Sequence, residues 1–338
     1  MTEGFDSGQA DHQILLSVAD LAVDFDTESG IVHAVQDVSW SIGAGETLGV
    51  VGESGSGKSV TAAALMDLIP ITGRVVNGTF IWHGDRVGSA ELARLRGSKI
   101  TMVFQDPMNA LNPLVQVGRQ ITEVLVKHVN LSRSAARRRA HELLELVGIP
   151  DPSRRMRQYP FEFSGGMAQR VVIAMALAAQ PEVLIADEPT TALDVTIQAQ
   201  ILDLMSELQK ELGIAIVLIT HDLGVVAGVA DHLAVMYAGR VIERGRSADV
   251  FANPYHPYTR GLLASTPHPR DVIDRLVPIK GNPPVVTELS PGCAFADRCP
   301  EAHDRCRVER PPMSAVPSHP ASETVVLRDR EVACWNAF

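Results

Sequence analysis

Hydrophobic and polar residues follow a regular order along the first 245 positions of the chain. Two segments alternate apolar and polar residues, and four are short apolar runs, as expected for strands. The predicted strands are 15–25, 34–42, 46–51, 100–104, 183–186 and 214–220. Helical periodicity or composition lies between them, at 60–68, 134–147, 165–179 and 197–212. Alternating strands and helices predict an α/β fold in which a mainly parallel sheet carries helices on both faces.

Two stretches depart from this alternation and indicate the domain organisation. Residues 106–163 have helical periodicity and are expected to form a helical subdomain. After Gly245 the chain becomes rich in proline, as in NPYHPYT at Asn253–Thr259. We therefore expect a larger domain at 1–245 and a C-terminal module at 246–338.

Composition and charge limit the function classes. With 338 residues, 46% of them hydrophobic, the chain can bury a large core and one smaller module. Its formal net charge of −10 argues against non-specific binding to nucleic acid. No apolar run approaches the roughly 18 residues needed to cross a bilayer, and the polar, acidic N-terminus is unlike a signal peptide. We expect a cytosolic protein that meets a membrane only through partners.

Gly52–Ser59, GESGSGKS, fits the phosphate-loop pattern between a predicted strand and a predicted helix. Glycines let consecutive backbone N–H groups face phosphates, Lys58 would reach the β- and γ-phosphates, and Ser59 would hold Mg²⁺. The expected nucleotide contacts of this loop are Gly52, Ser54, Gly55, Ser56, Gly57, Lys58, Ser59 and Val60.

An acidic pair, Asp187 and Glu188, ends the apolar run at 183–186. Such a pair, taken alone, is more often a surface turn than a catalytic group. Beside a phosphate loop, Asp187 is expected to hold Mg²⁺ through its water shell, and Glu188 to polarise the attacking water as general base.

A second candidate phosphate-binding element, Ser164-Gly165-Gly166, opens the helix predicted just before this acidic strand. The N–H groups and positive end of a helix N-terminus suit an anion. Two such elements cannot easily serve one site, so we expect two copies of the domain to share each nucleotide.

These motifs resemble the ABC-type ATPases over about the first 245 residues. The resemblance implies a P-loop core with a mainly parallel sheet, an antiparallel β subdomain, a helical subdomain and a small C-terminal cysteine module. MVFQDPMNALNPL, FSGGMAQRVVIAMALA and NPYHPYT further resemble ATP-binding subunits of di- and oligopeptide importers, with nickel-importing subunits as the nearest alternative. Met167 stands where the common ABC pattern has Gln, a departure that also occurs in the peptide-importer branch.

The resemblance also implies roles for single residues. His221 would be the switch histidine that contacts the γ-phosphate, and Gln105 would touch the metal and the attacking water. Asp194, in the ALD sequence at 192–194, would lie at the dimer interface. Phe25 is our candidate for stacking on adenine, although a core phenylalanine is a competing interpretation.

All four cysteines, Cys293, Cys299, Cys306 and Cys334, lie near the C-terminus. A reducing cytosol disfavours disulfides, and four thiolates can hold either Zn²⁺ or an iron–sulfur cluster. No C-x-x-C pair is present, and spacing leaves the two metals open. The resemblance favours a [4Fe–4S] cluster, which some importer subunits hold here.

We therefore expect an ATPase subunit that binds ATP and Mg²⁺ and powers import of peptides. The implied partners are a paralogous ATP-binding subunit or a second copy of this chain, two membrane permeases and an extracytoplasmic solute-binding protein. The expected location is the cytoplasmic face of the cell membrane. A non-transport ABC ATPase would need coiled-coil arms or a second ATPase domain, and an idle regulatory subunit would lack Lys58, Glu188, Ser164 or His221.

Overall fold

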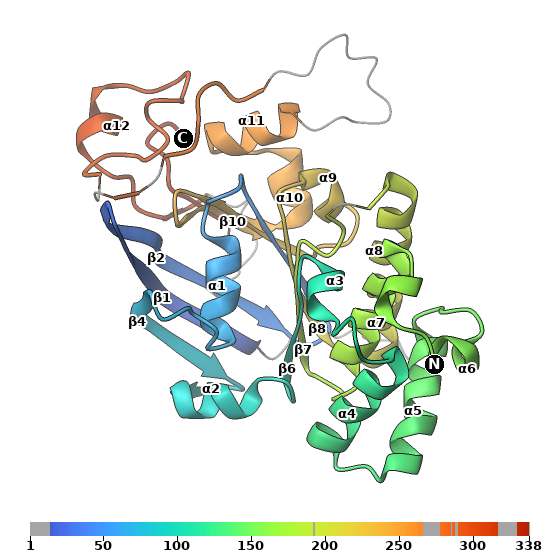
Figure 1. Cartoon of the computed structure of the whole chain (residues 1–338). Coiled ribbons are helices and arrows are strands. Elements are labelled where there is room, and N and C mark those ends of the chain that lie inside the picture. Colours follow the sequence, from blue (N-terminus) through green and yellow to red (C-terminus); the bar gives the residue numbers. More distant parts are fainter. Residues whose placement is uncertain are drawn as a thin grey trace, which may run out of the picture.

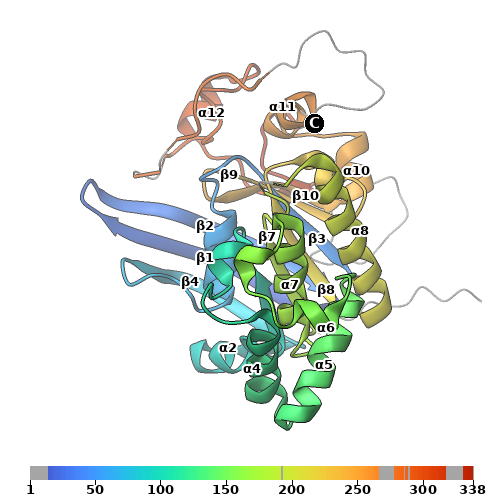
Figure 2. The same cartoon turned by 45° about the vertical axis from the view of Figure 1, so that its right-hand side comes forward.

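The computed structural model of the chain describes residues 14–191, 193–265, 278–284, 286–287, 290–316 and 330–337. Two sheets form its centre, most of the helices lie on the side of the larger sheet away from the smaller one, and a C-terminal tail lies beyond one end of the larger sheet (Figure 1). In both views the tail with α11 (Pro257–Ser265) and α12 (Asp304–Val308) is at the end opposite to α4 (Val117–Val129) and α5 (Arg133–Leu146) (Figure 2).

The smaller sheet is antiparallel, with strand order β2-β1-β4-β5. Its strands are β1 (Ile14–Thr27), β2 (Gly30–Gly43), β4 (Gly73–Trp82) and β5 (Asp85–Val87). Residues 15–18 of β1 are all buried, as are Leu21 and Val23, and a register shift lies between Val18 and Leu21. This sheet agrees with the antiparallel β subdomain that the resemblance implies.

The larger sheet has eight strands among the described residues, in the order β11-β12-β10-β9-β3-β8-β7-β6. Their bounds are β11 (Ser314–Ala315), β12 (Glu331–Val332), β10 (Arg240–Arg246), β9 (His232–Tyr237), β3 (Thr47–Val51), β8 (Ala215–Thr220), β7 (Val183–Asp187) and β6 (Ile100–Val103). Pairings from β9 to β6 are parallel, whereas β9–β10, β10–β12 and β11–β12 are antiparallel. The predicted mainly parallel sheet is thus confirmed in its centre, and its antiparallel edge was not foreseen.

Both faces of the parallel region are buried, which explains the continuous apolar runs of its strands. Val50 and Ile185 belong to a core cluster shared with the antiparallel sheet and α1 (Lys58–Leu65). Their neighbours Val51 and Leu184 point to the opposite face, into a cluster shared with the helices. The helices of that cluster include α7 (Gly165–Leu177) and α8 (Val195–Leu212).

Helices occupy much of the stretch predicted to be helical, and α4 and α5 are the longest of them, with 13 and 14 residues. These helices are α3 (Pro107–Ala110), α4, α5, α6 (Pro152–Arg155) and the 3₁₀ helix η1 (Pro160–Glu162), while α2 (Ser89–Leu95) precedes β6. Asn130, in the left-handed conformation, ends α4, and the Ser132 side chain caps α5 by accepting from the Ala135 N–H. Buried apolar residues of α4 and α5 join the same core cluster as α7.

The tail folds back onto the edge of the larger sheet. Helix α9 (Leu223–Val226) lies between β8 and β9, and α10 (Ser247–Ala252) directly follows β10. Buried Glu243 of β10 accepts the N–H groups of Tyr255 at 2.9 Å and His256 at 3.0 Å. These bonds fix the NPYHPYT turn that begins α11, and β12 later pairs with β10. None of the helices in the described ranges is long and apolar enough to span a bilayer.

Candidate active site

The phosphate loop leaves the C-terminal end of β3 and turns into α1, as predicted. Two of its glycines lie against neighbouring backbone: a Cβ on Gly52 would come 2.2 Å from the Met236 carbonyl oxygen, and one on Gly57 2.6 Å from that of Ala34. Gly57 also has a φ of 99°, which side chains rarely adopt. The loop can pass between β2 and β9 only because these positions are glycine.

Lys58 is buried at the start of α1 and folds back over the loop. Its ammonium donates to the carbonyl oxygens of Gly52, at 2.8 Å, and Glu53, at 3.0 Å. An ammonium has three N–H donors, so one remains for a phosphate. Burial lowers the Lys58 pKa, and the nearby carboxylates of Glu188, Asp187 and Glu53 oppose that shift.

Ser59 and Asp187 meet, although 128 positions separate them in the chain. The Ser59 hydroxyl donates to Asp187 Oδ1 at 2.9 Å. The pKa of Asp187 is raised, mainly because the carboxyl group is buried and also because of the charge of Glu188. The hydrogen bond from Ser59 and the charge of Lys58 oppose this rise. Beside them, the buried Ser56 hydroxyl has no hydrogen-bond partner among the described residues. A hydroxyl and a carboxylate side by side supply the oxygen ligands that Mg²⁺ prefers.

Glu188 lies at the centre of a second polar cluster. Its carboxylate accepts from Gln105 Nε2 at 3.1 Å and from the Thr191 hydroxyl at 2.9 Å, and His221 Nδ1 lies 3.3 Å from it. Glu188 also has a left-handed φ of 46°, a strained backbone for a non-glycine residue. The structure thus brings three predicted residues together at the ends of β6, β7 and β8, and Thr191 is an addition that no sequence pattern had indicated.

The second candidate phosphate-binding element, Ser164-Gly165-Gly166, does not join this cluster. Ser164 is the N-cap of α7 and accepts from the Met167 N–H at 3.4 Å, while Asp194 caps α8 by accepting from Ile197 N–H at 3.0 Å. A Cβ on Gly166 would come 2.5 Å from Ile197 Cγ2, so α7 and α8 pack closely here. No hydrogen bond or ion pair in the described part of the chain links Ser164, Gly165 or Gly166 to the phosphate loop.

Phe25, the predicted adenine contact, packs within the antiparallel sheet. It pairs with Val32 of β2 and Gly73 of β4, and its ring would lie 2.6 Å from a Cβ on Gly73. It is half-buried against the core cluster below it.

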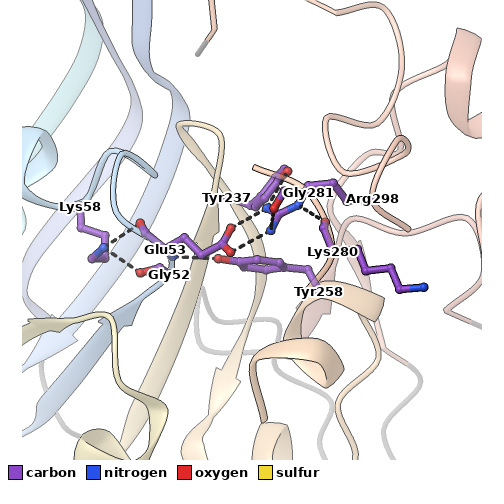
Figure 3. Close-up of polar contacts among 8 residues, drawn as sticks. All are labelled: Gly52, Glu53, Lys58, Tyr237, Tyr258, Lys280, Gly281 and Arg298. Carbon is purple, nitrogen blue, oxygen red and sulfur yellow. Dashed lines mark hydrogen bonds and ion pairs between the residues drawn. The ribbon is translucent and has the colours of Figure 1, made fainter. Parts of the chain in front are cut away.

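Residues of the tail reach the phosphate loop, which sequence patterns did not reveal. Arg298 forms a two-point ion pair with Glu53, and the Tyr258 hydroxyl accepts from the Glu53 N–H at 2.8 Å (Figure 3). Tyr258 lies inside the NPYHPYT stretch, whose unusual composition was a signal that could have pointed to it. Arg298 carried no such signal.

The predicted [4Fe–4S] cluster is wrong, as is the metal-binding role given to the four cysteines. All four lie within the described residues as free thiols, and no group of three or more His, Cys, Asp or Glu side chains there is arranged to hold a metal ion. Burial raises the pKa of Cys293, Cys299 and Cys334. The structural-zinc alternative fails on the same finding.

Hydrogen bonds and aromatic packing hold the tail in place of a metal. The Cys293 N–H donates to the Cys306 carbonyl oxygen at 2.7 Å. Buried Phe295 packs edge-on against Tyr237, with ring centroids 5.2 Å apart, and against Tyr258, at 5.4 Å. Cysteine spacing alone could not distinguish this arrangement from a metal site.

The sequence matches the ABC transporter family over residues 35–191 and the oligopeptide/dipeptide transporter C-terminal region over 242–306. It is 54% identical to the oligopeptide transport ATP-binding protein OppD of Bacillus subtilis, across 89% of this chain and 86% of that protein. It is 48% identical to the dipeptide transport ATP-binding protein DppD of the same organism, across 95% and 94%.

Solved structures match the ATPase part. The dimeric post-hydrolysis state of the ATP-binding cassette MJ0796, bound to ADP and Pi, is 28% identical with a TM-score of 0.61, covering 69% of this chain and 99% of that one. The cbiO1 protein of Clostridium perfringens, part of the ABC transporter complex cbiONQ, is 31% identical with a TM-score of 0.62, covering 71% and 92%. This chain therefore belongs to the ABC transporter family, among the oligopeptide and dipeptide transport ATP-binding proteins.

Proposed function

We propose that this chain hydrolyses ATP to power import of di- or oligopeptides through a membrane permease. The observation that carries the proposal is the meeting of Lys58, Ser59 and Asp187 with the cluster around Glu188 at one edge of the parallel sheet. In open α/β sheets, ligands bind outside the carboxyl ends of the parallel strands, which is where these residues lie. The peptide substrate is assigned from the relatives, whose names describe oligopeptide and dipeptide transport.

The phosphate loop and β7 would bind Mg²⁺-ATP. The Ser56 hydroxyl, which has no partner among the described residues, the third donor of Lys58 and the N–H groups from Gly57 to Ser59 fit the phosphates. Ser59 and Asp187 would hold Mg²⁺, directly or through water, with Gln105 close to the same metal. Bound Mg²⁺ neutralises charge that develops on the phosphates during transfer. Phe25 remains our candidate for stacking on the adenine ring.

Glu188 would act as the general base. Its carboxylate is held by donors from Gln105 and Thr191, which leaves it oriented to accept a proton from the attacking water. His221, beside the same carboxylate, would contact the γ-phosphate. The strained backbone at Glu188 indicates that the surrounding structure holds this residue in place at an energetic cost.

A second subunit would complete each nucleotide site. Ser164, Gly165 and Gly166 open α7, a helix of 13 residues whose free N–H groups suit an anion. No hydrogen bond or ion pair among the described residues links them to the phosphate loop of their own chain, so we assign them to the γ-phosphate bound by a partner. Asp194 would lie at this head-to-tail interface. The partner is a paralogous ATP-binding subunit or a second copy of this chain.

The permeases would dock between the sheet and the helical subdomain. A cavity of about 300 Å³ lies there, lined by Met102, Phe104, Ala110, Val124 and neighbouring residues. Phe104 is 45% exposed and directly precedes Gln105, so a docked segment would lie next to the catalytic cluster. An extracytoplasmic solute-binding protein would deliver the peptide, and this subunit would work at the cytoplasmic face of the membrane.

The substitution Glu188→Gln tests the proposal in cells that carry the complete transporter. We expect the variant to bind ATP as the wild type does, to lower ATP turnover by a factor of about 10² or more, and to abolish uptake of labelled peptides. Glu211→Gln, an exposed position at the end of α8, is the matched control. Wild-type turnover in Glu188→Gln would refute the general base, and uptake of Ni²⁺ without peptide would select the nickel alternative.

A further inference from the structure

Arg298, in the C-terminal tail, inserts its guanidinium next to the phosphate loop (Figure 3). Nη1 donates to Glu53 Oε2 at 2.6 Å and Nη2 to Oε1 at 2.9 Å, the two-point geometry characteristic of arginine and carboxylate. The Arg298 side chain is only 6% exposed. The pair joins residues 245 positions apart.

The remaining donors of Arg298 are also used. Nε donates to the Lys280 carbonyl oxygen at 2.9 Å, Nη2 to that of Gly281 at 3.2 Å, and Nη1 to the Tyr237 hydroxyl at 3.3 Å. All five N–H groups of the guanidinium therefore have acceptors. A lysine could not satisfy this set, because it offers a single point charge in place of a planar fork.

Glu53 connects Arg298 and Tyr258 of the tail to the rest of the phosphate loop. Its N–H donates to the Tyr258 hydroxyl at 2.8 Å, and burial raises the Tyr258 pKa, so the phenol stays neutral. Its carbonyl oxygen accepts from the Lys58 ammonium at 3.0 Å and from the Ser56 N–H at 3.2 Å. Every polar group of Glu53 is thus occupied, with the tail on one side and the phosphate-binding lysine on the other.

We infer that Arg298 is a positioning residue for ATP: acting through Glu53, it holds the phosphate loop and Lys58 in the conformation that receives the phosphates. The inference rests on the proposed binding of ATP by this loop. The tail would then help to bind ATP as well as fold, since two of its residues, Arg298 and Tyr258, form hydrogen bonds with the same loop residue, Glu53. Restraints formed before ligand arrives lower the ordering cost of binding.

The substitution Arg298→Met tests this in the full-length chain, with a non-hydrolysable ATP analogue as the probe. We expect the Kd for the analogue to rise roughly 10- to 100-fold, the scale of effect that displacement of a positioned group can have. In ATPase assays KM should rise similarly, while kcat at saturating ATP changes less than about twofold, because binding is weakened equally in the ground and transition states. A role confined to folding would lower the active fraction, and so kcat, and leave KM unchanged.

Two further variants isolate the route through Glu53. In a Glu53→Met background, Arg298→Met should change Kd less than about twofold, since contacting residues are non-additive. Arg307→Met is the matched control, because Arg307 lies in the same segment but pairs with exposed Asp297; its Kd should equal that of the wild type. If Arg298→Met does not fold, as judged by thermal melting, Tyr258→Phe replaces it, and a severalfold rise in Kd is expected.

The outcomes separate this inference from the proposed function. A wild-type chain that fails to bind the analogue refutes the proposed function. A wild-type chain that binds it, with the same Kd in Arg298→Met or in the substitute Tyr258→Phe, refutes the positioning role alone. Equal effects of Arg298→Met with and without Glu53 would refute the route through Glu53.

Discussion

At the scale of single residues, His256 makes the stability of the chain depend on pH. The residue is buried, its Nδ1 accepts from the Tyr258 N–H at 3.0 Å, and burial, with the charge of Arg260, lowers its pKa to about 3. Between that value and about 6.5, the ordinary histidine pKa, only the unfolded chain takes up the proton. Stability therefore falls as pH drops through this window, by up to about 1.4 kcal/mol per unit. His256→Asn should remove this dependence, because it does not titrate.

Urea unfolding of both proteins at pH 7 and pH 5 checks this. The free-energy difference between wild type and His256→Asn should shift by about 2 kcal/mol in favour of the variant at the lower pH. Titrating carboxylates affect both proteins alike and cancel in the comparison. Parallel pH dependences would show that His256 is protonated in the folded chain.

At the scale of elements, the contact between α4 and the start of the loop after α6 depends on Gly118. A Cβ there would come 2.7 Å from both the backbone oxygen and the Cβ of Met156, whose carbonyl accepts from the Gly118 N–H at 3.0 Å. We expect Gly118→Ala to destabilise the chain by about 1–3 kcal/mol, the usual cost of overpacking. Gly228→Ala is the control in the same thermal melting experiment, because no atom beyond the adjacent residues of the chain lies within 4 Å of the added carbon. Equal melting temperatures for the two variants would contradict the close packing.

At the scale of the whole molecule, the separation of Ser164 from the phosphate loop of its own chain predicts an effect in trans. A Ser164→Arg subunit should block turnover at the site whose Lys58 belongs to its partner, because a bulky cation replaces the helix N-cap that would face the γ-phosphate. In a complex with a paralogous partner, each site can be disabled separately and ATPase activity measured for each pairing. Full activity in every pairing would mean that the two elements do not share a nucleotide.

Local sequence predicted the elements around the phosphate loop, and the family resemblance supplied their architecture. The apolar runs at 46–51, 183–186 and 214–220 became β3, β7 and β8, because a parallel strand buried on both faces leaves little choice of residue. Strands β9 and β10 were not predicted, and their places in the sheet, between β3 and β12, follow from pairings between segments far apart in the chain. Gln105, Glu188 and His221 follow three different strands; the family resemblance placed all three around the γ-phosphate and the attacking water, and the fold brings them together.

The sequence by itself determined the chemistry available: a phosphate loop, an acidic pair after a strand, and a helix that opens with Ser-Gly-Gly. These motifs are local, because consecutive residues must bend the backbone or cap a helix. The tertiary structure alone decided what lies between distant residues. It left the four cysteines as free thiols, with no group arranged to hold a metal among the residues that the structure describes, and it placed Arg298 against Glu53 across 245 positions. Such contacts depend on how the tail packs against the sheet, and cysteine spacing or a single arginine carries no record of that packing.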